Sequence, residues 1–386
     1  MSRIVVLGSG AWGTAIALAL HRRGGHQITL WSHSDDEARQ IASAGENTLF
    51  LPGFPLPKAI LLTAAGDAIS EAEIIVSVIP SGFVRPTLTR LRPWFRSGQI
   101  VVSATKGVEN NTHLRMTEVI ASSLAATIPT AAVVPAGTHQ GLERTPNANP
   151  DIKLEVFDED SAPEVSSSGI EPAPRELDEL ILPIGAFSGP SFALEVAQGQ
   201  PTAVTVAFDD LSVAARIQHE FSSETLRLYT STDVIGVELG GALKNVIAIA
   251  AGVAAGMGLG HNSAAALMTR GIAEITRLAV ACGGRRETLA GLSGVGDLVL
   301  TCTGSLSRNR TVGQALGQGR NLPEILESLG GKVAEGVLTT RAALGLARRH
   351  GIEMPITEQM ELILDEGKDP REAIKDLMLR PGKHEH

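Results

Sequence analysis

Short apolar runs, each ended by a polar or glycine-containing turn, dominate the first part of the chain. The clearest are Ile4–Leu7, Ile28–Trp31, residues 73–80, residues 99–105 and Thr202–Phe208. The runs are continuous rather than alternating, which is typical of parallel strands covered on both faces. Helical patterns follow at Thr14–Arg23 and Leu211–Ser222. The pattern predicts a doubly wound α/β domain over residues 1–228.

From Asp233 onward, strand signals nearly vanish and helical periodicity takes over. The expected helices cover residues 236–258, 263–282, 311–318, 335–350, 356–365 and 370–379. A chain of 386 residues is long for one domain, so two domains are the default expectation. The sequence therefore predicts an α/β N-terminal domain followed by an all-α domain over residues 229–380.

One lysine stands out in the helical half. From Leu239 to Thr269, Lys244 is the single permanently charged side chain in an Ala, Gly, Ile and Val segment. Burial disfavours the ammonium and lowers a lysine pKa, so such a group can exchange a proton near neutral pH. In a helix, Gly240 and Gly241 lie one turn before Lys244 and predict a hollow beside the amine. The alternative is a lysine that reaches past an apolar helix to solvent.

A glycine turn follows the first strand directly. Gly8, Gly10 and Gly13 stand between Ile4–Leu7 and a helical pattern. In this context the glycines permit a tight turn and let the backbone approach a pyrophosphate at a helix N-terminus. Thr14 occupies the place where a P-loop needs lysine, which excludes that class of nucleotide site. A glycine turn without a ligand is the alternative.

The end of the second strand bears on the choice of dinucleotide. NAD-specific folds usually place an acid there to bind the ribose 2′-hydroxyl. This chain has Ser32-His33, and Asp35 and Asp36 come slightly late. His33, with Arg39, would instead face a 2′-phosphate, so NADP is expected as well as NAD, with a preference for NADPH as one expected outcome. A surface histidine at a strand end is the alternative.

Candidate anion ligands follow the later strands. Lys106 falls beyond the carboxyl end of a strand, where ligands bind in open α/β sheets. Gly189-Pro190 predicts a helix start that leaves the amides of Ser191 and Phe192 free for an anion. In the helical half, a glycine-rich turn leads to Asp297, and Ser307-Arg308-Asn309-Arg310 suits an oxygen-rich phosphate. Exposed loop lysines and a solvated basic loop are the alternatives.

The formal net charge of −9 argues against a nucleic-acid partner. Between Ala136 and Leu180, eleven acids face three bases, so this stretch carries −8. Its prolines and its lack of sustained apolar periodicity predict a flexible acidic insertion; a regulatory docking segment is the alternative. Two cysteines without CxxC spacing indicate a reducing compartment, the cytoplasm. No integral membrane segment and no metal site are expected.

Several motifs in fixed order carry a family resemblance. They are GSGAWGTAIA, SATKG, SGPSFA, TSTDVIGVELGGALKNVIAIAAG, GLSGVGDLVLTCTGSLSRNR and VAEGV. The chain resembles the bacterial NAD(P)-dependent glycerol-3-phosphate dehydrogenases over nearly its whole length, except the acidic insertion. The resemblance implies a Rossmann-type domain, a helical domain, a homodimer, and reduction of dihydroxyacetone phosphate to sn-glycerol 3-phosphate for phospholipid synthesis.

The resemblance also implies roles for individual residues. Lys244 matches the catalytic lysine. The positions that match substrate ligands are Lys106, Gly189, Ser191, Asp297, Ser307, Arg308 and Asn309. Besides the three turn glycines, the positions that match cofactor contacts are Trp12, His33, Lys106, Ala193, Arg308, Val333 and Glu335. Lys106 and Gly189 are closer in sequence in the family than here, which places the insertion near the cleft entrance and affects substrate access.

Two other functions fit parts of the pattern. A β-hydroxyacid or ketopantoate-type reductase would share the two-domain plan and the interdomain lysine, but its substrate would be a carboxylate. A non-catalytic NADPH-sensing regulator would bind the cofactor without turnover. Such a sensor has no need for Lys244 together with Asp297 and a phosphate clamp.

Overall fold

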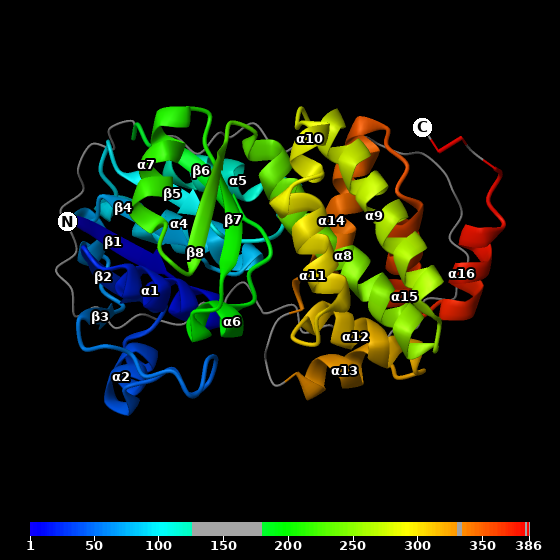
Figure 1. Ribbon diagram of the computed structural model, residues 1–386, viewed down its shortest axis with the longest axis horizontal. Helices are drawn as coiled ribbons and strands as arrows, with labels where there is room; N and C mark the ends of the chain where they lie inside the picture. Colours follow the sequence, from blue (N-terminus) through cyan, green and yellow to red (C-terminus); the bar gives the residue numbers. More distant parts are fainter. Residues whose placement is uncertain (126–179, 330–333, 383, 386) are drawn as a thin grey trace, which may run out of the picture.

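The computed structural model describes residues 1–125, 180–329, 334–382 and 384–385. The predicted acidic insertion and Val333 lie outside these residues, apart from Leu180 at the insertion's end. A sheet half and a helical half lie side by side, with α8 at their junction (Figure 1). The predicted fold class, an α/β Rossmann-type domain followed by helices, is confirmed.

Eight strands form one sheet in the order β3-β2-β1-β4-β5-β6-β7-β8. Their bounds are β1 Ser2–Leu7, β2 His26–Trp31, β3 Ile60–Thr63, β4 Ile74–Ser77, β5 Ile100–Ser103, β6 Ile184–Ser188, β7 Thr202–Ala207 and β8 Leu226–Ser231. All neighbours pair in parallel except β6 and β7, which are antiparallel. Since β8 ends at Ser231, a division of the chain at 228 would fall within this strand.

Helices cover both faces of the sheet, as continuous apolar strands require. Buried side chains of α1, α6 and α7 pack on one face, and those of α3, α4 and α5 pack on the other. Their bounds are α1 Ala11–Arg23, α2 Asp35–Ala44, α3 Asp67–Ser70, α4 Val84–Leu91, α5 Met116–Leu124, α6 Ala193–Gln198 and α7 Leu211–Phe221, with short 3₁₀ turns at Ser81–Phe83 and Arg92–Trp94.

The expected helix start at Gly189-Pro190 is wrong. Helix α6 begins three residues after the proline, at Ala193. In its first backbone hydrogen bond, the Val196 amide donates to the Phe192 carbonyl. Gly189 has φ +148, which directs the chain away from β6 before it can enter a helical turn. Ser191 donates its hydroxyl to the Gly189 carbonyl at 2.9 Å and stabilises this bend.

The helical half is built around α8. Its helices are α8 Val234–Gly256, α9 His261–Ala281, α10 Arg286–Leu289, α11 Asp297–Thr303, α12 Arg308–Gly317, α13 Leu322–Ser328, α14 Glu335–His350, α15 Pro355–Glu366 and α16 Pro370–Met378, with a π-helical turn at Leu292–Gly296. By length and composition α8 could cross a membrane, but 89% of its apolar window is buried inside the protein. It is the core helix of this half.

Glycines let α8 and α12 approach backbone to backbone. A Cβ on Gly252 would lie 2.1 Å from the Arg310 carbonyl oxygen, and one on Gly313 would lie 1.9 Å from that of Ile249. Such distances exclude any side chain larger than hydrogen. The small residues of α8 therefore fix where α12, with Ser307 as its N-cap, begins.

The described residues on either side of the predicted insertion lie at the amino edge of the sheet, whereas the expected place of the insertion near the cleft entrance falls outside the described residues. Helix α5 follows β5 and runs back to the amino edge of the sheet, because the next strand, β6, is parallel to β5. At that edge Arg92 donates to the Leu124 carbonyl at 2.9 Å, and the Gly98 amide donates to the Ile181 carbonyl at 3.0 Å. Leu124 and Ile181, near the ends of the two described segments, are thus held at the sheet edge opposite to Lys106.

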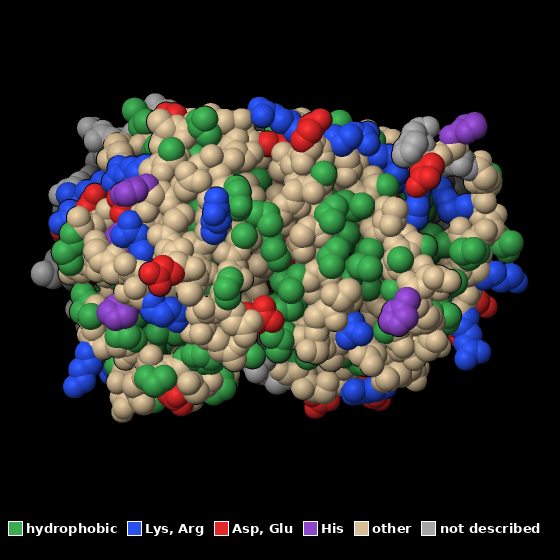
Figure 2. Space-filling view, viewed as in Figure 1, with side chains coloured by type: hydrophobic (Ala, Val, Ile, Leu, Met, Phe, Trp, Pro, Cys, Tyr) green, Lys and Arg blue, Asp and Glu red, His purple; other side chains and the backbone are tan. Residues whose placement is uncertain are grey.

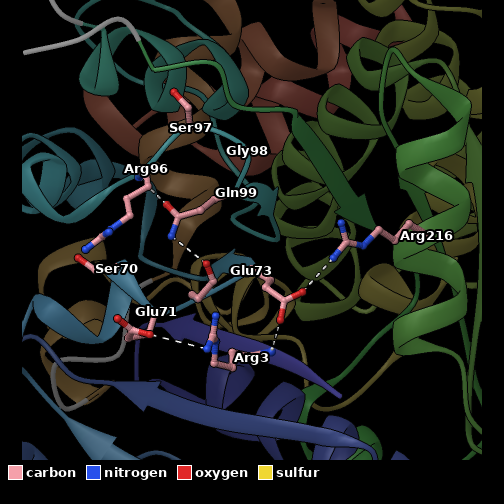
Figure 3. A pocket seen from close by; sticks show the side chains of 10 residues that line it. Arg3, Ser70, Glu71, Glu73, Arg96, Ser97, Gly98, Gln99 and Arg216 are labelled. Carbon is pink, nitrogen blue, oxygen red and sulfur yellow. Dashed lines mark hydrogen bonds and ion pairs between the residues drawn. The ribbon is translucent and has the colours of Figure 1, made fainter.

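A hollow also lies at this amino edge (Figure 3). Its lining includes Arg3, Arg96 and Arg216, and two of these pair with acids, Arg216 with Glu73 at 3.2 Å and Arg3 with Glu71 at 3.7 Å. In parallel sheets, ligands bind at the carboxyl edge. The candidate site is therefore expected at the carboxyl edge of the sheet.

Candidate active site

Two lysines from the two halves of the protein share one carboxylate. Lys106 follows β5, Lys244 lies in the middle of α8, and Asp297 opens α11. Asp297 Oδ1 lies 2.6 Å from Lys244 Nζ, and Oδ2 lies 2.7 Å from Lys106 Nζ. Lys106 also donates to the Gly189 carbonyl at 3.1 Å. Residues that are 83 positions apart in sequence are thus in direct contact.

Lys244 does not reach solvent. It is 6% exposed, and its amine donates to Asp297 and to Thr301 Oγ1, the latter at 2.7 Å. Burial lowers the pKa of Lys244 to about 8; Asp297 opposes this shift and Lys106 adds to it. An amine with this pKa is populated in both protonation states near neutral pH, which is what general acid and base chemistry needs.

The space beside the two glycines before Lys244 is not the hollow that was predicted, because neighbouring segments fill it. A Cβ on Gly240 would lie 2.5 Å from the Ser293 carbonyl oxygen, and one on Gly241 would lie 2.2 Å from Ser188 Oγ. The glycines therefore allow the turn before α11 and the end of β6 to pack directly on α8. This close packing brings Asp297 and Lys106 to Lys244.

Helix α14 connects the start of α12 to the part of α8 that carries Lys244. Asn309 Oδ1 accepts from the Gly336 amide at 2.9 Å, and a Cβ on Gly336 would lie 2.7 Å from the Asn245 carbonyl oxygen. Ser307 is the N-cap of α12, since its Oγ accepts from the Arg310 amide at 3.2 Å. Asn309 is therefore held next to the backbone of the residue after Lys244.

Arg308 and Glu335 add a second pair of charges near the lysines. Arg308 is exposed, and Glu335 opens α14. Burial raises the pKa of Glu335, and the positive charges of Arg308, Lys106 and Lys244 oppose that shift. The three cations Lys106, Lys244 and Arg308 outnumber the two acids Asp297 and Glu335, and this excess of positive charge suits a phosphate group. The individual binding roles expected for these residues stay predictions.

At the same carboxyl edge, the glycine turn has the geometry of a nucleotide cradle. A Cβ on Gly13 would lie 1.9 Å from the Gly8 carbonyl oxygen, whereas a Cβ on Gly10 would meet nothing within 4 Å. Gly10 is the N-cap of α1 without a side-chain cap, so the first amides of the helix are open to an anion. The residues present fit a dinucleotide pyrophosphate.

Aromatic packing links the cradle to the lysine cluster. Trp12 stacks on Phe187 with ring centroids 6.2 Å apart, and Phe187 precedes Ser188 and Gly189 at the end of β6. Trp12 Nε1 is buried without a hydrogen-bond partner. Ala193, the first residue of α6, packs against the same core cluster as Trp12. Strand β6 therefore connects the glycine turn, through Phe187, to the Gly189 carbonyl that accepts a hydrogen bond from Lys106.

The end of β2 holds an acid that sequence reasoning missed. Glu37 folds back from α2, and its Oε2 lies 2.6 Å from His33 Nδ1. Thr301, whose hydroxyl accepts a hydrogen bond from the Lys244 amine, was not predicted from the sequence either. Glu37 had a signal in the sequence, because a side chain in the first turn of a helix can reach back past the N-cap, here Ser34. Thr301 lies one helical turn after Asp297, a spacing that places both side chains on one face.

The open space above Gly10 yields a prediction. Gly10→Ala is expected to fold normally, since the added methyl meets no protein atom, but to weaken dinucleotide binding about tenfold or more, since the methyl blocks the approach of the pyrophosphate. Calorimetric titration with NADH, together with thermal unfolding, measures both effects.

A matched control is available. Gly260→Ala changes another open helix N-cap, that of α9, and is expected to alter neither quantity. Equal NADH affinity in the wild type and Gly10→Ala would mean that the cradle does not bind the pyrophosphate.

Comparisons with known proteins agree with this geometry. Residues 3–139 and 170–214 match the family described as NAD-dependent glycerol-3-phosphate dehydrogenase N-terminus, and residues 233–375 match its C-terminus. The glycerol-3-phosphate dehydrogenase [NAD(P)+] of Acidobacterium capsulatum is 52% identical, covering 100% of both chains. That of Koribacter versatilis is 50% identical, covering 100% of this chain and 99% of the relative.

A solved structure agrees as well. The crystal structure of glycerol-3-phosphate dehydrogenase from Coxiella burnetii superposes with a TM-score of 0.80 at 33% identity, covering 98% of this chain and 99% of that one. With a glycine cradle and a buried lysine cluster at one sheet edge, and with both family segments matched, the chain belongs to the NAD-dependent glycerol-3-phosphate dehydrogenase family.

Proposed function

We propose that this chain catalyses the reversible reduction of dihydroxyacetone phosphate to sn-glycerol 3-phosphate with NADH or NADPH, and that Lys244 is the acid and base of the reaction. The observation that carries the proposal is the buried Lys244–Asp297–Lys106 cluster beside the nucleotide cradle. The product supplies glycerophospholipid synthesis.

Lys244 has the properties that the proton transfer requires. In the reduction, its protonated amine donates a proton to the C2 oxygen of the triose and stabilises the developing alkoxide. In the oxidation, the neutral amine removes the hydroxyl proton. The bound nicotinamide supplies or accepts the hydride. Asp297 and Thr301 orient the amine, since both accept its hydrogen bonds.

The cations around the lysine would bind the substrate phosphate. Lys106 and Arg308 provide charge, and the backbone of α12 with Ser307 and Asn309 provides hydrogen-bonding groups at its N-terminus. We assign the dinucleotide to Gly8, Gly10, Gly13 and Trp12, with His33, Ala193, Val333 and Glu335 along its length. A carboxylate substrate has less charge and fewer oxygens than a phosphate for these groups to bind.

A paired assay tests the proposal against the two alternatives. Loss of nicotinamide absorbance is followed with dihydroxyacetone phosphate and, separately, with ketopantoate. We expect turnover with the phosphorylated triose alone. Faster turnover with the phosphate-free acid would identify a ketopantoate-type reductase, and binding of NADPH without turnover of any triose phosphate would identify a sensor.

The lowered pKa of Lys244 predicts opposite pH profiles for the two directions. Reduction needs the ammonium, so its kcat is expected to be level below pH about 8 and to fall above it. Oxidation needs the free amine, so its kcat is expected to rise toward pH about 8 and then to level. Initial rates across the pH range measure this. Profiles that bend in the same direction would assign the proton transfer to another group.

We also propose a homodimer that works in the cytoplasm. Apolar side chains gather on the exposed face over α9 and α11 (Figure 2). In and just before α11, Val299 is 44% exposed and Val295 is 38% exposed. A patch of this kind supports association with a second copy. Both cysteines are free, which supports a reducing compartment.

Sedimentation velocity tests the proposed homodimer. The wild type is expected to give twice the mass of one chain, and Val299→Asp is expected to halve this mass. A wild-type monomer would contradict the dimer.

A further inference from the structure

The carboxylate of Glu37 joins the glycine cradle to the end of β2. Its Oε1 accepts from Ser9 Oγ at 2.8 Å, and its Oε2 accepts from Ser32 Oγ at 2.7 Å. Ser9 lies between the first two glycines of the cradle, and Ser32 directly follows β2. Ser9 is 4% exposed and Ser32 is fully buried. The two serines therefore fix Glu37 at the place where these two segments meet.

This place is where dinucleotide folds read the ribose of the adenosine half. An acid at the end of the second strand there binds the 2′-hydroxyl of NAD, and a basic group there accepts the 2′-phosphate of NADP. The residues at the strand end itself, Ser32 and His33, supply no acid. The first turn of α2 supplies it instead, through the side chain of Glu37.

The basic groups near this place are already engaged. His33 lies against Glu37, with its Nδ1 2.6 Å from Oε2. Arg39 pairs with Asp36 on the exposed side of α2. The guanidinium of Arg90 lies over the ring of Trp31, 5.8 Å from its centroid. A 2′-phosphate would therefore meet a fixed carboxylate before it could recruit a free cation.

We propose that Glu37 selects the dinucleotide: its carboxylate accepts a hydrogen bond from the ribose 2′-hydroxyl of NADH and repels the 2′-phosphate of NADPH, so that this chain prefers NADH. The proposal rests on the dinucleotide site of the proposed function but goes beyond it. The same carboxylate keeps His33 from facing the phosphate. Glu37 therefore contributes to selectivity in two ways, by attraction of the 2′-hydroxyl and by repulsion of the 2′-phosphate.

Binding titrations with NADH and with NADPH test the proposal without turnover. The wild type is expected to bind NADH about tenfold or more tightly than NADPH. Glu37→Gln keeps the size of the side chain but removes its charge, and it frees His33. It is expected to lower the preference for NADH about tenfold or more, through tighter NADPH binding and weaker NADH binding.

The matched control is Asp35→Asn, which removes the same charge from the first turn of α2 while Asp36 keeps its ion pair with Arg39. It is expected to leave the preference unchanged. An unchanged preference in Glu37→Gln, or an equal change in Asp35→Asn, would overturn the proposal. If thermal unfolding shows that Glu37→Gln is not folded, the wild type alone decides. Tighter binding of NADPH than of NADH to the wild type would then overturn the proposal. Turnover of dihydroxyacetone phosphate with either dinucleotide is independent of these outcomes, so the proposed function is tested separately.

Discussion

Lys244→Met is expected to lower kcat in both directions by about 10²–10⁴-fold, the usual contribution of a positioned general acid or base. Methionine keeps an unbranched apolar chain in the buried position but cannot donate or accept the proton. Dinucleotide affinity is expected to stay within about twofold of the wild type, because the Gly8–Gly13 cradle belongs to the sheet half. Steady-state rates and NADH titrations provide the two readouts.

A second substitution separates charge from proton transfer. Lys244→Arg keeps a positive charge beside Asp297, but the pKa of an arginine lies far above neutral pH and prevents exchange of the proton there. This variant is expected to lose turnover nearly as fully as Lys244→Met. Wild-type rates in either variant would show that Lys244 is a structural cation.

Asp297→Asn is expected to have the second largest effect. Its carboxylate opposes the fall in the pKa of Lys244 that burial causes, so its loss lowers that pKa further and leaves Lys106 and Lys244 facing each other without an acid between them. Reduction of the triose is expected to slow by about 10-fold to 100-fold at neutral pH, since less of the amine is protonated. The falling limb of the pH profile for reduction is expected to move to lower pH.

Glu274→Gln is the control for loss of a buried carboxylate as such. Glu274 accepts from the Ile356 amide at 2.7 Å at the start of α15, in the helical half. Its substitution is expected to destabilise the protein modestly but to leave the pH profile in place. A profile that moved equally in both variants would mean that Asp297 acts through the fold rather than through Lys244.

The sequence predicted the elements that have a strong periodic signal. Continuous apolar runs located β1, β2, β4, β5 and β7, and α8, α9, α14, α15 and α16 lie within a few residues of their expected bounds. The reversal of β7 was not predicted, because the direction of a strand is set by its connection to β6 and not by its own residues. Helix α6 was misplaced because proline is compatible with both a helix start and the bend that follows Gly189.

The candidate site was predicted in its residue types but not in its packing. A charged residue in an apolar helix indicated that Lys244 was special, and burial, the largest cause of its lowered pKa, could be expected from that pattern. Which acid pairs with it depends on how the turn before α11 packs on Gly240, a tertiary contact without a local signal. Likewise, the position of Leu124 and Ile181 at the amino edge follows from the parallel pairing of β5 and β6, which a pattern of apolar residues does not encode.

The proposed reaction depends on transfer of the proton at C2 of the substrate by Lys244. A crystal structure of the complex with NAD and sn-glycerol 3-phosphate shows whether Lys244 is placed to transfer it. We expect Lys244 Nζ to lie about 2.6–3.2 Å from the C2 hydroxyl oxygen, with the nicotinamide on the opposite face of that carbon. A C2 hydroxyl that contacted another titratable group, with Lys244 Nζ more than about 5 Å away, would contradict it.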